Sequence, residues 1–337
     1  MHIFRNFLHT ICHALKDFSA TNLVEAARAQ ITGHVPTDGH ILVACSLGVD
    51  STTAAFLCGH VLGKDRVHAV FVNNGLLRNE DLALAEQAHT FLPGFVIEDA
   101  EKRFLAALEG VADPEEKRRR IGELFWLVFG EVALKLGKQY PIVAFSQGTL
   151  APDRIESGTD SAGSDVIKTH HNMVPRPPDF PFQPLEPLAR LYKDQVRTIG
   201  ATIGVPDQVL SRHPFPGPGL AIRIDGPVTP ERLEIARACD DIFTCALHKA
   251  GWYHAVSQAL AVLKASRSVA VLGDKRARKC SVELRAFVTR DFMTATVADL
   301  PNFFKDEVAS EITNRVPEVT SVSFCHTTKP PGTIEWE

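Results

Sequence analysis

A short stretch at residues 46–52, with the sequence Ser-Leu-Gly-Val-Asp-Ser-Thr, carries the clearest chemistry in this chain. It follows the apolar run Ile41–Cys45, which is typical of a buried strand, and precedes a run with helical character. In such a unit the loop N–H groups and the helix N-terminus converge on one point, where an anion can bind. The hydroxyl groups that could add donors belong to Ser46, Ser51 and Thr52. Asp50 would repel a phosphate unless it held Mg²⁺, so the stretch indicates a phosphate site with a metal.

Leu47 is the unexpected residue of this stretch, because a loop that closely surrounds a pyrophosphate would be expected to carry glycine there. Two backbone conformations would have different consequences. With a negative φ and a side chain directed into the domain, leucine would cost little. With a positive φ, leucine would strain the loop, and we would then expect a weakened or altered activity.

The elements that would hold this loop alternate between apolar strand candidates and helix candidates from residue 41 to about residue 209. We expect strands at Ile41–Cys45, Val67–Val72, Phe95–Glu98 and Ile142–Phe145. We expect helices at Ser51–Leu62, Asn79–Phe91, Pro114–Leu136 and Asp194–Ile203. This alternation predicts an α/β fold with a doubly wound parallel sheet. Ligands bind at the carboxyl ends of the strands in such sheets, so the loops that begin at Ser46, Asn73 and Ser146 should share one rim.

The pattern changes twice further along the chain. Residues 157–187 are rich in glycine, polar residues and proline, which is typical of a mobile lid. A rigid proline and glycine run begins at His213, and the elements expected after it are helices at Pro230–Lys249 and Lys305–Asn314 and strands at Val269–Leu272, Val282–Val288 and Ser321–Phe324. We therefore predict an N-terminal extension at 1–22, a first domain at 23–212 with the lid at about 157–187, and a smaller C-terminal α/β domain at 213–337.

The bulk composition excludes several classes of function. The chain has 337 residues, enough for roughly two domains, and its net charge of −4 argues against nucleic-acid binding by bulk charge and against a polybasic membrane contact. No apolar stretch approaches the ~20 residues that a membrane span needs. Seven scattered cysteines without a CxxC pair indicate free thiols in a reducing cytoplasm rather than disulfides or a zinc site. We expect a short surface helix at the N-terminus rather than a transit peptide.

The stretch at residues 46–52 resembles the pyrophosphate loop SGGVDS of the N-type ATP pyrophosphatases, with leucine in place of one glycine. Longer motifs resemble the GMP synthetase family, and they run from about Leu23 to the last residue. These motifs are Val70–Arg78 (VFVNNGLLR), Ser146–Ser157 (SQGTLAPDRIES), Ile167–Asn172 (IKTHHN), His213–Arg223 (HPFPGPGLAIR) and Lys329–Glu337 (KPPGTIEWE). The resemblance implies an adenine-nucleotide alpha hydrolase-like first domain and a C-terminal domain that binds XMP and forms a homodimer.

The reaction that the resemblance implies is XMP + ATP + ammonia → GMP + AMP + pyrophosphate, with ATP and Mg²⁺ as cofactors. The 2-oxygen of xanthine cannot leave as hydroxide. It therefore attacks the α-phosphate of ATP and becomes an adenyl ester, from which ammonia displaces AMP. We do not find the glutamine-hydrolysing domain that usually precedes this region in the family. We therefore expect ammonia to come from a separate glutamine amidotransferase subunit or from solution.

The resemblance also assigns roles to individual residues. The residues expected to bind ATP and pyrophosphate are Ser46, Gly48, Val49, Asp50, Ser51, Thr52, Asn73, Gly75, Gln147 and Gly148. The expected catalytic residues are Asp50, Lys168, His170, His171, Asp153 and Glu156, with Asp50 as the ligand of Mg²⁺. Lysine and histidine side chains of the lid would then stabilise charge on the phosphates. The residues expected to bind XMP are Arg223, Gln258, Lys329, Ile334 and Glu335. Because terminal residues are usually frayed, a role for Glu335 requires a docked tail.

Some positions depart from the family pattern, and most of them lie on the ATP side. They are Leu47, Asn73, Ala151, the run Met173–Pro175 and the basic segment 273–279. These departures leave two alternatives open. The chain could be a specialised relative that adenylates another purine nucleotide or uses another nucleophile such as sulfur, or it could be a non-catalytic nucleotide binder. The retained Asp50, Lys168 and Glu335 favour catalysis over the second alternative.

Overall fold

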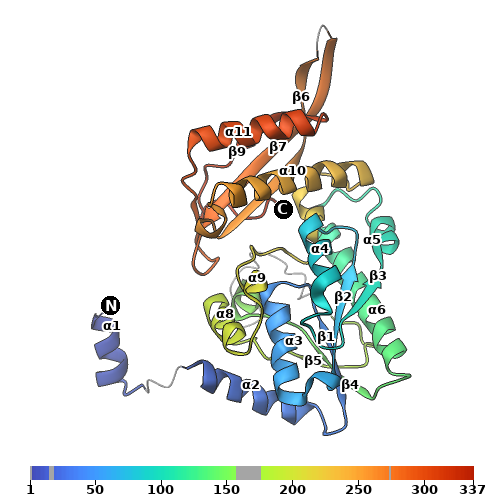
Figure 1. Cartoon of the computed structure of the whole chain (residues 1–337), viewed down its shortest axis with the longest axis vertical. Helices are drawn as coiled ribbons and strands as arrows, with labels where there is room; N and C mark the ends of the chain where they lie inside the picture. The colour runs from blue at the N-terminus through green and yellow to red at the C-terminus, as the bar shows by residue number, and fades with distance from the viewer. Residues whose placement is uncertain (1, 15–18, 157–175, 273–274) are drawn as a thin grey trace.

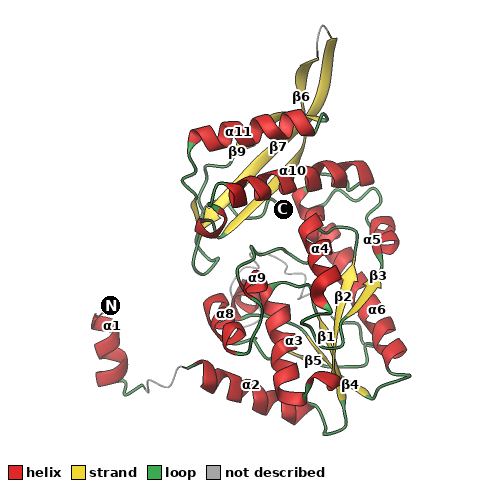
Figure 2. Ribbon diagram, viewed as in Figure 1, coloured by secondary structure: helices red, strands yellow, loops and turns green. Residues whose placement is uncertain are grey.

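The computed structural model of the protein describes residues 2–14, 19–156, 176–272 and 275–337. Within these ranges the fold contains a parallel sheet covered by helices and a second, smaller sheet with two helices against it (Figures 1 and 2). The α/β fold predicted from the sequence is therefore confirmed.

The first sheet has five parallel strands in the order β3-β2-β1-β4-β5. Their bounds are β1 His40–Ala44, β2 Val67–Asn73, β3 Val96–Asp99, β4 Ile142–Ser146 and β5 Pro184–Leu185. Side chains alternate between two cores, so that Ile41 and Val43 pack on one face of the sheet and Leu42 on the other. The strand order reverses between β1 and β4, and ligands of such folds bind in the crevice at that point.

Helices cover both faces of this sheet. The face with Ile41 packs against α2 (Ala20–His34), α3 (Val49–Leu62) and α8 (Lys193–Thr202), and the face with Leu42 packs against α5 (Glu101–Ala107) and α6 (Pro114–Leu136). Helix α4 (Asn79–Ala88), which connects β2 to β3, also packs on the face with Ile41, and two shorter helices are α7 (Ala151–Glu156) and α9 (Asp207–Leu210). The start of α6 follows the local signals in the sequence, because Asp113 accepts a hydrogen bond from the Glu116 N–H at 2.8 Å and Pro114 occupies the first turn.

The second sheet is built around a long antiparallel hairpin that projects from the molecule (Figure 1). Its strands are β6 Gln258–Leu272, β7 Lys275–Val288, β8 Thr296–Val297 and β9 Val319–Phe324, with helices α10 (Pro230–Lys249) and α11 (Asn302–Arg315) packed against them. The sequence predicted a strand only from Val269, but β6 starts at Gln258. The run Ala259–Leu263 is buried throughout, and without alternation it carries no strand period.

One hydrophobic cluster continues from the α6 face of the first sheet to the second sheet, and it includes Leu220 of the turn between them, Phe243 of α10 and Leu284 of β7. The 3-10 turn Gly219–Arg223 lies at this junction, and the Leu220 N–H donates to the Leu76 carbonyl at 2.8 Å. Gly219 has a φ of +61°, and a Cβ there would come within 2.4 Å of the same carbonyl oxygen. The two parts therefore share a packed junction, and the boundary near residue 213 remains a prediction.

The N-terminal segment forms a short helix, α1 (His2–Asn6), continued by a π-helical turn at Phe7–Ile11. The segment that we predicted as an extension ends inside α2, which begins at Ala20 after the N-cap Ser19. None of the helices in the described ranges has the length and apolarity that a bilayer crossing requires.

Candidate active site

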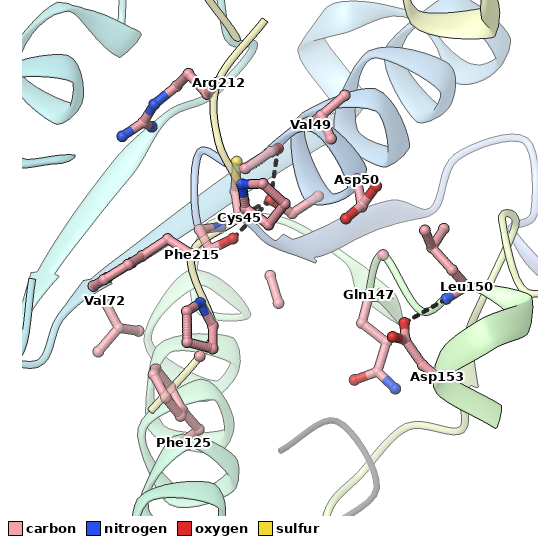
Figure 3. Close-up of a pocket in the computed structure, with 18 of the residues that line it drawn as sticks. Cys45, Val49, Asp50, Val72, Phe125, Gln147, Leu150, Asp153, Arg212 and Phe215 are labelled. Carbon is pink, nitrogen blue, oxygen red and sulfur yellow. Dashed lines mark hydrogen bonds between the residues drawn. The ribbon is translucent and has the colours of Figure 1, made fainter. Parts of the chain in front are cut away.

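A cavity of about 340 Å³ lies at the carboxyl ends of β1 and β4 (Figure 3). Gln258 of β6 also lines it, so the cavity extends to the second sheet. The predicted site residues that line it are Ser46, Gly48, Val49, Asp50, Ser51, Gln147, Gly148, Asp153, Gln258 and Glu335. Residues predicted for the ATP site and residues predicted for the XMP site thus face one space. Apolar side chains form another part of its wall, among them Phe125 and Trp126 of α6.

The loop after β1 is organised by its own hydroxyl groups. The Ser46 N–H donates to the Ser51 Oγ at 3.0 Å, and the two Oγ atoms are 3.1 Å apart. Gly48 is the N-cap of α3, so the free N–H groups of the first helical turn face the loop. Thr52 is fully buried and contacts the thiol of Cys45 at 4.0 Å, so it supports the loop from behind instead of lining the cavity.

Leu47 combines the two conditions that we treated as alternatives. Its φ is +60°, which is the left-handed region, yet its side chain is 0% exposed and packs in the core around α3. The left-handed conformation costs about 1–2 kcal/mol for an L-residue, and burial of a leucine side chain contributes about 1.5–3 kcal/mol. The burial therefore offsets the strain. The Leu47 carbonyl also accepts a hydrogen bond from Arg212 Nη1 at 3.2 Å, which holds the loop from outside.

Gly148 shows how closely the loops after β1 and β4 approach one another. A Cβ at this position would lie 2.8 Å from the carbonyl carbon of Asp50 and 2.8 Å from the Ser51 backbone nitrogen. Because both neighbours are backbone atoms, no side chain could move aside, and glycine is required by the close approach.

Asp50 has a carboxylate with one paired and one unpaired oxygen. Oδ2 lies 2.5 Å from the Lys193 Nζ, whereas Oδ1 is buried without a hydrogen-bond partner in the described structure. No cluster of three metal-ligating side chains occurs among the described residues. The single carboxylate of Asp50, with its unpaired Oδ1, fits Mg²⁺, because this ion is commonly held by one or two carboxylates together with substrate phosphates. The sequence analysis missed Lys193, although its position at the start of α8, just beyond β5, places it on the same rim.

The loop after β4 is braced by side-chain contacts. Asp153 Oδ2 accepts a hydrogen bond from the Leu150 N–H at 2.8 Å (Figure 3), and Gln147 Nε2 donates to Glu186 at 2.7 Å. Asp153 therefore stabilises its own loop while it faces the cavity. Glu156 is the last residue of α7, and its side chain lies outside the described structure. The lid residues Lys168, His170 and His171 also lie outside the described residues, so their roles stay predictions.

The loop after β2 differs from the expectation in detail. Asn73 and Gly75 were predicted to bind ATP, but the residues of this loop that line the cavity are Asn74 and Leu77. Asn73 donates to Asp99 at 3.1 Å and accepts from the Gly75 N–H at 3.1 Å, so its amide is used to shape the turn. Arg237 of α10, the helix packed against the second sheet, donates to the Gly75 carbonyl at 3.0 Å.

Arg223 is 0% exposed and does not line the cavity. Its guanidinium donates to both carboxylate oxygens of Glu335, at 3.1 and 3.0 Å, and to Asp240 at 3.2 Å. Gln258 donates to the same Glu335 carboxylate at 2.6 Å. Burial raises the pKa of Asp240, and the charge of Arg223 opposes that shift. In this arrangement Arg223 contacts Glu335, and Glu335 with Gln258 faces the cavity.

Two further residues predicted to bind XMP lie behind the cavity wall. The Lys329 ammonium donates to the Phe292 carbonyl at 2.8 Å, and Phe292 lines the cavity. Ile334 is buried in a small core with Leu260 and Phe287. The docked tail that a role for Glu335 requires is present, because Ile334 and Glu335 are each only 7% exposed.

A row of charged and aromatic side chains links the two ends of the cavity. Arg212, which holds Leu47, pairs with Asp81, and Asp81 binds Arg78 at 2.9 Å. Burial alone would raise the pKa of Asp81, but these two guanidinium groups lower it to about 2. The Phe215 ring lies between Arg78, at 4.3 Å, and Arg223, at 4.9 Å.

His213 begins the rigid run and is 6% exposed. Its ring stacks on Tyr253 at 3.9 Å, and Nε2 lies 2.9 Å from the Tyr253 carbonyl. Burial lowers the pKa of His213 to about 4, so the ring is neutral near pH 7 and fits a packing role.

Comparison with known proteins adds independent information. Residues 245–336 match the family model of the GMP synthase C-terminal domain. The chain is 47% identical to the glutamine-hydrolyzing GMP synthase of Thermus thermophilus over 338 residues, which cover 100% of this chain and 66% of that protein. It is 45% identical to the synthase of Symbiobacterium thermophilum, covering 99% and 64%, and 42% identical to that of Bdellovibrio bacteriovorus, covering 100% and 66%. The chain thus spans about two thirds of the length of these curated relatives.

Proposed function

Because the chain belongs to the GMP synthase family and corresponds to its synthetase portion, we propose that it converts XMP to GMP with ATP and ammonia, releasing AMP and pyrophosphate. One observation carries this proposal: a single cavity contains both the loop at residues 46–52 and the pair formed by Gln258 and Glu335. Two nucleotides bound at these ends would meet inside one partly enclosed space.

The end of the cavity near α3 would bind the phosphates of ATP. The N-terminus of α3, the Ser46 hydroxyl and the Lys193 ammonium offer donors and positive charge to the departing pyrophosphate. Asp50 Oδ1 would hold Mg²⁺, which when bound would neutralise charge that grows on the pyrophosphate. Asn74 and the loop after β2 would border the adenosine.

The other end of the cavity would bind the purine of XMP. A carboxylate accepts hydrogen bonds from purine N–H groups more strongly than a neutral acceptor does. Arg223 and Gln258 fix the orientation of the Glu335 carboxylate, so little freedom would be lost when the purine binds. The 2-oxygen of xanthine would then face the α-phosphate, and the roles of the predicted lid residues belong to this proposal.

We further propose that the nucleophile is ammonia, which comes from a separate glutamine amidotransferase or from solution, and that the second domain forms a homodimer. The relatives are glutamine-hydrolyzing synthases, which supports an ammonia-using reaction. All seven cysteines are free thiols, which supports a cytoplasmic location.

A specialised relative with another purine or another nucleophile is not favoured, because the relatives over the full chain are GMP synthases. The only thiol that lines the cavity in the described structure is Cys45, and burial raises its pKa. A buried thiol of this kind is a poor candidate for sulfur transfer.

The proposal is tested by incubating the purified chain with XMP, ATP, Mg²⁺ and ammonium and following GMP and pyrophosphate together. We expect equimolar GMP and pyrophosphate, and no GMP without ammonium. Pyrophosphate release only with another purine nucleotide would favour the specialised relative. An absence of turnover, with ATP and XMP still binding in calorimetry, would favour the non-catalytic binder.

A further inference from the structure

Lys117, in the first turn of α6, is buried completely although it carries an ammonium group. Its Nζ donates to the carbonyls of Ala221 and Ile224, at 3.0 and 2.7 Å, and to the Glu337 carboxylate at 2.6 Å. Burial lowers the pKa of Lys117, and the pairing with Glu337 opposes that shift. One ammonium group thus binds three oxygen atoms from three different residues.

The three contacts surround the ion pair between Arg223 and Glu335. The carbonyls of Ala221 and Ile224 belong to the turn that carries Arg223, and Glu337 lies two residues beyond Glu335. The ammonium of Lys117 therefore holds the backbone of the turn that carries Arg223 and the side chain of Glu337. The same helix contributes Phe125 to the cavity wall (Figure 3). Lys117 therefore connects the helix of that wall to Glu337, two residues beyond the carboxylate of Glu335.

Other contacts hold the same tail from the second domain. Arg285 donates to the Thr333 carbonyl at 2.6 Å, and the Lys264 ammonium lies 3.1 Å from the centre of the Trp336 ring. Among these three cations, Lys117 is the one that belongs to the helix covering the first sheet. Lys117 therefore links the tail directly to the helix that covers the first sheet.

Stability alone is a weak reason for such a pair. Desolvation of two buried charges costs about as much as their attraction returns, and hydrophobic replacements of buried ion pairs are often neutral or stabilising. An ammonium group differs from an apolar side chain in that its donors fix directions and distances to several oxygens at once. The geometry at Lys117 therefore suits a role in orientation.

We propose that Lys117 is a positioning residue for the purine site. Its contacts hold Arg223 and Glu335 in the relative position in which the Glu335 carboxylate can bind XMP. This inference rests on the proposed function for the identity of the ligand. The effect of Lys117 on the order of the tail at residues 334–337 can be tested without turnover.

The test compares Lys117→Met, the double variant Lys117→Met/Glu337→Leu, and Lys135→Met as a control on the same helix. Lys135 is 72% exposed at its side chain and lies near Glu98, so its loss should change nothing. We expect KM for XMP to rise about 10- to 100-fold in Lys117→Met, a range typical of a lost orienting contact, with kcat and KM for ATP nearly unchanged. In the double variant the unfolding midpoint should recover in part, because the Glu337 side-chain carboxylate is no longer left unpaired, whereas KM for XMP should stay raised.

A return of KM for XMP to the wild-type value in the double variant would overturn the proposal, because Lys117 would then act on stability alone. Hydrogen exchange at the amides of residues 334–337 and calorimetric XMP binding give readouts without turnover. We expect faster exchange and weaker XMP binding in both Lys117 variants. Unchanged exchange with unchanged XMP binding would also overturn the proposal. If the wild-type chain binds XMP but forms no GMP, the proposed function fails, and these two measurements still decide the role of Lys117.

Discussion

Leu47 allows strain and burial in the phosphate loop to be measured separately. Its backbone has a φ of +60° and its side chain is 0% exposed. Leu47→Ala removes the buried side chain but keeps an L-residue in the left-handed region, so the free energy of unfolding should fall by about 3–5 kcal/mol. Leu47→Gly removes the same side chain and also relieves about 1–2 kcal/mol of backbone strain.

Glycine also gains more freedom in the unfolded chain, which costs about 0.5–1 kcal/mol. We therefore expect Leu47→Gly to be about 1 kcal/mol more stable than Leu47→Ala and about 2–4 kcal/mol less stable than the wild type. Urea unfolding of the three proteins, followed by circular dichroism at one temperature, measures this order.

A glycine variant more stable than the wild type would refute the argument that burial offsets strain. An alanine variant at least as stable as the glycine variant would contradict the positive φ. The rate of GMP formation adds a second test. If leucine impairs the loop, Leu47→Gly should be faster than the wild type, whereas the buried side chain leads us to expect no increase.

Three further predictions concern charge and packing around the cavity. Asp50→Ala should lower GMP formation at least about 100-fold, while calorimetry should show XMP binding unchanged, because the carboxylate acts at the phosphate end; weakened XMP binding would contradict that placement. Arg237→Met should raise KM for ATP more than KM for XMP in steady-state kinetics, because it frees the Gly75 carbonyl of the loop that borders the adenosine; the reverse order would count against it. The neutral form of His213 contributes stability that is complete above its ordinary pKa of 6.5 and is lost as the pH falls toward 4. Between pH 7 and pH 5 the contribution should fall by about 2 kcal/mol, and urea unfolding of His213→Gln should lack this part of the loss.

The sequence determined the features that depend on short-range chemistry. Helices α6 and α10 begin and end at the predicted residues, because an N-cap and a proline mark each start locally. The alternation of strands and helices was sufficient to predict the parallel sheet and the rim of that sheet on which the loop at residues 46–52 lies. The buried run at the start of β6 was missed because it has no alternation.

Only the tertiary structure decided which charged side chains face one another. Lys117 and Glu337 are 220 positions apart, and Lys193 is 143 positions from Asp50, so no local pattern connects them. Arg223 was expected to bind a ligand, yet its guanidinium is taken up by Glu335 and Asp240. Residue types and spacing indicate what a side chain can do. Its partners are set by the packing of distant segments, and the partners decide whether a charge is free to bind substrate or is used to hold another residue in place.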